Sequence, residues 1–152
     1  MSAVPHLPAL RRGKPYESLD KSEVLDHGTG QVVAVVSQVN AGIIKKDLQK
    51  IGEARAALRK FTSAELIQIS AKAGDLFLNG TLPLGDKGHM QSADDYVKTL
   101  SGTSGLPHVM VRRNMAKIHY ALTHVGVVLN GLTRGLPLEV IDRGYGEQSG
   151  AA

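Results

Sequence analysis

The chain has 152 residues and a mass of 16.2 kDa, which suits one domain of ordinary size and leaves little for a second. Hydrophobic residues make up 42% and charged residues 21%, a composition typical of folded rather than disordered chains. Cysteine is absent, which excludes disulfides, thiolate metal sites and a cysteine nucleophile within these residues.

The charge pattern argues against a polyanionic partner. The net charge is +4, and residues 1–75 carry 11 basic and 8 acidic side chains against 7 and 6 in residues 76–152. With so even a spread, we expect a solvated surface and no nucleic-acid binding. No apolar run approaches the roughly 20 residues of a membrane span, and the first residues lack the charged and apolar regions of a secretory signal. The sequence therefore predicts a cytoplasmic chain without membrane contact.

We expect three regions along the chain. Residues 1–18 contain Pro5, Pro8 and Pro15 and predict an extended arm, which either wraps a neighbouring domain or stays mobile. Residues 19–137 are expected to hold a β-hairpin followed by helices. Residues 138–152 contain one short apolar patch and several glycines and are expected to form a tail.

The hairpin is predicted over residues 22–38, with its turn at Gly28-Thr-Gly30. Its second arm, residues 31–38, is rich in valine and favours a strand. The valines do not alternate cleanly with polar residues, so we expect this strand to be covered on both faces.

Two helices are expected next. Asn40 can cap a helix from Ala41 to Phe61, whose basic face either binds phosphate or is simply solvated. Its apolar stripe consists of Ile44, Leu48, Ile51, Leu58 and Phe61. Thr62 and Glu65 fit a capping box that starts a second, antiparallel helix, which ends at Asn79-Gly80 with a left-handed glycine.

Residues 80–92 should form a loop that contains Gly85-Asp-Lys-Gly88. The spacing of these residues does not match a phosphate-binding Walker sequence, so we interpret them as a turn. Ser92 caps a short helix to Leu100, and Pro107 begins a long helix to Arg134, about 42 Å if continuous. Gly126 and Gly131 suggest that another element approaches this helix closely. Its predicted apolar seam consists of Val111, Met115, Ile118, Leu122, Val125, Leu129 and Leu132.

No catalytic, cofactor-binding or metal-binding residue is predicted. His119 and His124 lie about 140° apart around a helix and cannot share an ion, and His27 and His89 are expected in loops. Asp94 and Asp95 are interpreted as first-turn acids of a helix. No nucleophile-elbow sequence surrounds the hydroxyl residues that precede a helix start near His108, which are Ser101, Thr103 and Ser104. A dinucleotide motif is not expected either, because Gly144-Tyr-Gly146 is too short for one.

The order of these elements resembles the N-terminal segment of the aldehyde dehydrogenase superfamily, closest to a divergent acyl-CoA-reductase-like branch. The resemblance is carried by His27-Gly-Thr-Gly-Gln-Val-Val-Ala-Val-Val-Ser-Gln38, by Ile51-Gly-Glu-Ala-Arg-Ala-Ala-Leu58 and by Leu100-Ser-Gly-Thr-Ser-Gly-Leu-Pro107, and it covers about residues 20–135. It implies an α+β chain, mainly helical with an N-terminal hairpin, that forms part of the larger α/β fold of that family.

The resemblance also implies a function. The chain would be the N-terminal fragment of an NAD(P)-dependent oxidoreductase acting on an aldehyde or acyl thioester, with residues 138–152 leading toward a missing nucleotide-binding region. The family's cysteine nucleophile and its NAD or NADP contacts lie beyond the matched segment, so the chain alone would bind no cofactor and be inactive. Self-association, or packing on the missing domain, is then expected. The alternative is a free-standing helical module for interaction or dimerisation.

Overall fold

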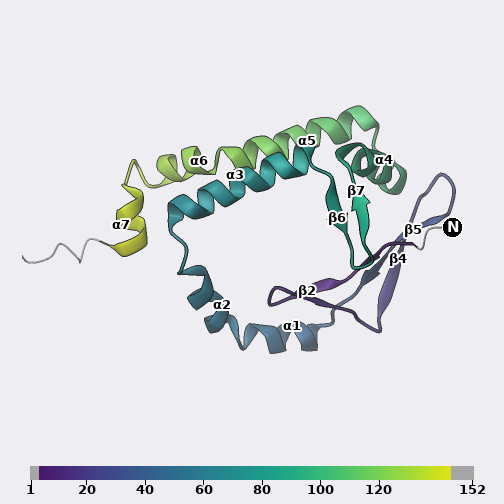
Figure 1. Cartoon of the computed structure of the whole chain (residues 1–152), viewed down its shortest axis with the longest axis horizontal. Coiled ribbons are helices and arrows are strands. Elements are labelled where there is room, and N and C mark those ends of the chain that lie inside the picture. The colour runs from purple at the N-terminus through teal and green to yellow at the C-terminus, as the bar shows by residue number, and fades with distance from the viewer. Residues whose placement is uncertain (1–3, 145–152) are drawn as a thin grey trace, which may run out of the picture.

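The computed structural model describes residues 4–144 and shows a mainly helical α+β chain, as the sequence predicts (Figure 1). Its strands are β1 (His6–Leu7), β2 (Ala9–Arg11), β3 (Lys14–Tyr16), β4 (Lys21–Leu25), β5 (Val32–Ser37), β6 (Leu82–Leu84) and β7 (His89–Gln91). Its helices are α1 (Ala41–Leu48), α2 (Ile51–Leu58), α3 (Ser63–Asn79), α4 (Ala93–Ser104), α5 (His108–Thr123), α6 (Val125–Leu132) and α7 (Leu138–Arg143). None of the helices in this described range is long and apolar enough to cross a bilayer.

The predicted hairpin is confirmed and belongs to a three-stranded sheet. β4 and β5 pair antiparallel, and β1 adds to the other edge of β5 in parallel, with His6 opposite Val35. The predicted arm, of which the structure describes residues 4–18, therefore begins as a sheet strand and continues into the β2–β3 hairpin. Only Ala34 and Ser37 of β5 are buried and its valines are half-buried, so full cover of the strand on both faces is wrong.

The buried core lies where α3, α4 and α5 meet. Val97 of α4 and Val111 and Met115 of α5 are enclosed, and Phe77 of α3 packs edge-on against Tyr96 with ring centroids 5.4 Å apart. The capping boxes of Thr62 with Glu65 and of Ser92 with Asp95 are both formed, so the predicted starts of α3 and α4 are confirmed. Gly80 ends α3 with a φ of −81°, not in the predicted left-handed conformation.

The predictions for residues 80–92 and for the end of α4 are wrong. Residues 80–92 contain the β6–β7 hairpin rather than a plain loop, although the Gly85–Gly88 turn is at its tip. α4 continues through Ser101, Thr103 and Ser104 to a left-handed cap at Gly105, whose N–H donates to the Ser101 carbonyl. The predicted end of this helix at Leu100 is therefore wrong, and the residues that we placed before the next helix are helical themselves.

The predicted long helix is divided at His124, whose φ and ψ are −107° and 13°. The Thr123 hydroxyl donates to the His119 carbonyl at 2.9 Å, a back-bond of the kind that bends helices. The seam is buried only at Val111 and Met115, and Leu132 at its far end is exposed. Of the two helix glycines, Gly126 lies against Ile67 of α3, whereas Gly131 has no close neighbour.

The first predicted helix is also divided, into α1 and α2. Lys50 N–H donates to the Asp47 carbonyl in a tightened last turn, and Gly52 follows at a position that weakens helix propagation. No residue of α1 or α2 is buried, and the extensive contacts between elements do not include either helix. The two helices lie on the opposite side of the molecule from α3 and α5, so no packed antiparallel pair with α3 forms (Figure 1).

Candidate functional site

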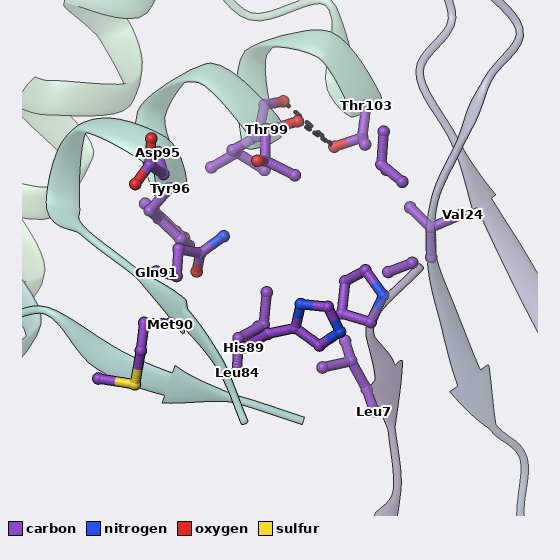
Figure 2. Close-up of a pocket in the computed structure, with 14 residues that line it drawn as sticks. Leu7, Val24, Leu84, His89, Met90, Gln91, Asp95, Tyr96, Thr99 and Thr103 are labelled. Carbon is purple, nitrogen blue, oxygen red and sulfur yellow. Dashed lines mark hydrogen bonds between the residues drawn. The ribbon is translucent and has the colours of Figure 1, made fainter. Parts of the chain in front are cut away.

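A cavity of about 460 Å³ lies between the β1–β5–β4 sheet, the β6–β7 hairpin and α4 (Figure 2). Its walls are mostly apolar, with Leu7 and Val24 on the sheet side and Leu84 and Met90 on the hairpin side. The β6–β7 hairpin spans from the helices to the sheet and so forms one side of this region (Figure 1). It is suited to binding an apolar group of small-molecule or side-chain size.

The polar groups around this cavity do not form a catalytic set. Thr103 donates to the Thr99 carbonyl at 2.9 Å, as Figure 2 shows, and Asp95 is engaged by the Ser92 cap. Those cap hydrogen bonds hold the pKa of the Asp95 carboxyl below its usual value. The other polar side chains at the wall are those of His89 and Gln91 from β7 and of Tyr96 and Thr99 from α4. His89 therefore lies in a strand and not in the loop we predicted.

A second cluster lies at the buried histidine of β1. His6 Nε2 is 2.9 Å from Ser37 Oγ, and His6 Nδ1 is 2.7 Å from Asp86 Oδ2. The hydrogen bond to His6 is the main reason that the pKa of the Asp86 carboxyl is lowered. A carboxylate oxygen of Glu17 also lies within 4.8 Å of the His6 and Asp86 ligand atoms.

The serine, histidine and aspartate of this cluster are connected as in a hydrolytic triad, but the serine is not placed for attack. Ser37 is 6% exposed, and its Oγ accepts a hydrogen bond from the Ser18 N–H at 3.0 Å. Neither Ser37 nor His6 lines the cavity of Figure 2. The network therefore holds β1, β5 and the β6–β7 turn together rather than activating a nucleophile.

Sequence reasoning missed this cluster because its members are far apart along the chain. His6 is separated from Ser37 by 31 residues and from Asp86 by 80. The one local signal was the Gly85-Asp-Lys-Gly88 sequence, which indicated a turn but not what the turn would touch. Spacing rules for metal or catalytic motifs concern residues that are near one another in the sequence, so they do not predict a contact between side chains from such distant segments.

The residues that the sequence did single out lie apart from one another. His119 Nε2 is 2.8 Å from Asp75 Oδ1, whereas His124 stacks on Tyr120 with ring centroids 3.8 Å apart. Asp94 and Asp95 occupy the first turn of α4, as predicted, and Asp94 pairs with Arg112. Residues 145–152 of the predicted tail, which include most of the Gly144-Tyr-Gly146 sequence, lie outside the described residues. The start of the predicted tail forms α7.

α1 contacts the β2–β3 hairpin through its acidic residue Asp47. Arg11 forms a two-pronged pair with Asp47, with both N–O distances 2.7 Å, and its guanidinium lies over the Tyr16 ring. This pairing lowers the pKa of the Asp47 carboxyl. Arg12 pairs with Glu53 of α2. Charged pairs at the surface, rather than buried apolar contacts, therefore connect α1 and α2 to the strands.

Comparisons of the chain with models of protein families, with curated proteins and with solved structures found no match.

Proposed function

We propose that this chain is a non-catalytic packing segment of a cytoplasmic aldehyde dehydrogenase-like oxidoreductase. In this proposal another polypeptide surface, which carries the cysteine nucleophile and the NAD or NADP site, packs on the chain. The complete assembly acts on an aldehyde or an acyl thioester. The chain itself supplies structural support and binds no cofactor.

The observation that carries the proposal is the amount of exposed surface. The accessible surface of the chain is 11364 Å², whereas a folded monomer of this mass exposes about 7,500 Å². An extended segment as long as the eleven undescribed residues would explain about 1,600 Å² of the difference. Roughly 2,000 Å² remains on this chain alone. Covering it with an equal area of a partner would bury about 4,000 Å² in total, which is within the range of obligate protein–protein interfaces.

Part of the exposed apolar surface lies on α1 and α2. Their predicted stripe is present but uncovered, since Ile44, Leu48, Ile51 and Leu58 are each about half exposed. Together with Leu10 of β2, part of this stripe lines a groove of about 340 Å³. Apolar patches of this kind are typical of surfaces that pack against another polypeptide.

The resemblance names the class of protein that would provide that surface. Its three segments correspond to the β4–β5 turn and strand, to α2, and to the step from α4 into α5. α2 spans Ile51–Leu58, the same residues as the second segment, and belongs to the uncovered face. An exposed α2 fits a segment whose covering surface lies elsewhere.

Sedimentation and hydrophobic-dye binding test the proposal. We expect the purified chain to self-associate and bind dye at micromolar concentration through the α1–α2 face. Ile51→Glu should reduce both, because it places a charge on that face, while Gln49→Glu adds the same charge beside it and should change neither. A monomeric chain that binds no dye and unfolds cooperatively would refute the proposal.

The alternative, a free-standing dimerisation module, is favoured by α6, where Val127, Val128 and Leu132 are exposed. It predicts a discrete dimer that Val128→Glu dissociates and that Ile51→Glu leaves intact. Both readings predict no NAD-dependent turnover, because no cysteine is present to form a covalent intermediate. Turnover above a buffer blank, or a micromolar dissociation constant for either dinucleotide, would contradict both.

A further inference from the structure

Three separate segments bring potential metal ligands together at His6. His6 comes from β1, Glu17 follows β3, and Asp86 lies in the β6–β7 turn. One ligand atom from each residue lies within 4.8 Å of the other two. The tip of the β6–β7 hairpin reaches the sheet at this point (Figure 1).

The turn that carries Asp86 is shaped to approach His6. Gly85 has a φ of +72°, and a Cβ at this position would lie 2.0 Å from the His6 carbonyl oxygen. The Asp86 N–H donates to the same carbonyl at 3.2 Å. Only glycine allows both the backbone conformation and the close approach, so the local sequence places the Asp86 carboxylate beside the imidazole.

The imidazole is held from its other side. His6 is 4% exposed, and its Nε2 is anchored by Ser37 Oγ, which leaves Nδ1 directed toward Asp86. Metal-binding histidines characteristically have the second ring nitrogen fixed in this way, because the hydrogen bond orients the ring. The Glu17 and Asp86 side chains are 63% and 28% exposed, so an ion can reach the cluster from solvent.

We propose that His6 Nδ1 and the carboxylates of Glu17 and Asp86 bind a divalent first-row transition metal, represented by Zn²⁺. Zinc bonds of about 2.0–2.2 Å put tetrahedral ligand atoms about 3.4 Å apart. This separation lies between the 2.7 Å of the His6–Asp86 contact and the 4.8 Å limit of the cluster, so small side-chain shifts suffice. One nitrogen and two carboxylates suit zinc better than calcium, which prefers six or more oxygens.

Binding rearranges two existing contacts. The ion replaces the hydrogen bond between His6 and Asp86, and it competes with Lys21 for Glu17, which Lys21 contacts at 2.5 Å. Because the ligands come from three segments, the ion ties the N-terminal strands to the tip of the β6–β7 hairpin. A metal that binds only the folded chain stabilises it by mass action.

Calorimetric titration of the full chain with Zn²⁺ tests the site, with thermal unfolding measured in parallel. We expect one high-affinity ion per chain and an unfolding temperature that rises with Zn²⁺ concentration. Glu17→Gln and Asp86→Asn should each weaken binding at least about tenfold, which is the effect of losing even a supporting partner. Glu17 is exposed, so its amide variant should fold even if the Asp86 variant does not.

The matched control is Asp75→Asn. Asp75 and His119 form a similar His–carboxylate pair on α3 and α5, and residues 4–144 place no third ligand beside it. This substitution should therefore leave Zn²⁺ affinity and stoichiometry unchanged. Absence of Zn²⁺ binding at micromolar concentration would overturn the proposal. Full affinity in Glu17→Gln, or loss of the ion in Asp75→Asn, would also overturn it.

Discussion

Val97→Ala tests whether the junction of α3, α4 and α5 is the stabilising core of the chain. Val97 is completely buried against Val111 and Met115. Removing two buried carbons costs about 1.6 kcal/mol in transfer free energy. A residual cavity of about 30–50 Å³ adds about 1 kcal/mol, and the better helix propensity of alanine returns about 0.5. We therefore expect the free energy of unfolding to fall by about 2 kcal/mol.

Urea unfolding followed by far-ultraviolet circular dichroism measures this loss. The control is Val127→Ala in α6, which makes the same chemical change at a side chain that is 69% exposed. It carries the same gain in helix propensity but removes no buried contact, so its effect should stay within about 0.5 kcal/mol. Equal effects of the two substitutions, or an unchanged midpoint for Val97→Ala, would refute the assignment of the core.

Three further predictions concern the same architecture. Gly74→Val should destabilise the chain by about 1–3 kcal/mol, because a Cβ at Gly74 would already lie 3.1 Å from the Leu122 Cβ. Gly131→Ala should instead stabilise the chain by about 0.5–1 kcal/mol, because a Cβ there has no neighbour within 4 Å, and the midpoints of urea unfolding measure both effects. Amide exchange should be slow in α3–α5 and fast in α1 and α2, which lack buried residues, and similar protection throughout would contradict this. The hydrogen-bonded pair with Arg11 lowers the pKa of the Asp47 carboxyl in the folded state. The stability that this pair contributes is therefore present above the unfolded-state pKa of Asp47 and is lost as the pH falls through its folded-state pKa. In this acidic range the urea midpoint should depend on pH less steeply in Asp47→Asn than in the parent chain.

Helix starts were predictable because their signals are local. The Thr62–Glu65 and Ser92–Asp95 boxes satisfy backbone N–H groups within a single turn, so neighbouring residues decide the structure. The β4–β5 hairpin was predictable for the same reason, since glycines next to a valine run favour a turn and a strand. The α+β class follows from these elements.

Apolar periodicity determined which faces were candidates for burial but not which of them would be buried. The stripe of α1 and α2 and the seam of α5 and α6 have comparable patterns, yet only Val111 and Met115 are enclosed. Burial requires a second surface at the right distance. α3 and α4 provide one for α5, and α3 also touches α6, whereas α1 and α2 make no extensive contact with another described element. The breaks at Lys50 and His124 likewise depend on side-chain hydrogen bonding and tightened turns that a periodic pattern does not contain.

The sequence by itself determined the β4–β5 hairpin, the capped starts of α3 and α4, the absence of a thiol nucleophile in these residues, and the Gly85–Gly88 turn. Only the tertiary structure decided that this turn carries Asp86 to His6 and Glu17, across up to 80 residues of chain. The physical reason is that a capping box or a tight turn is stabilised by contacts within a few residues. A cluster of side chains from three segments exists only after the sheet and the β6–β7 hairpin have come together.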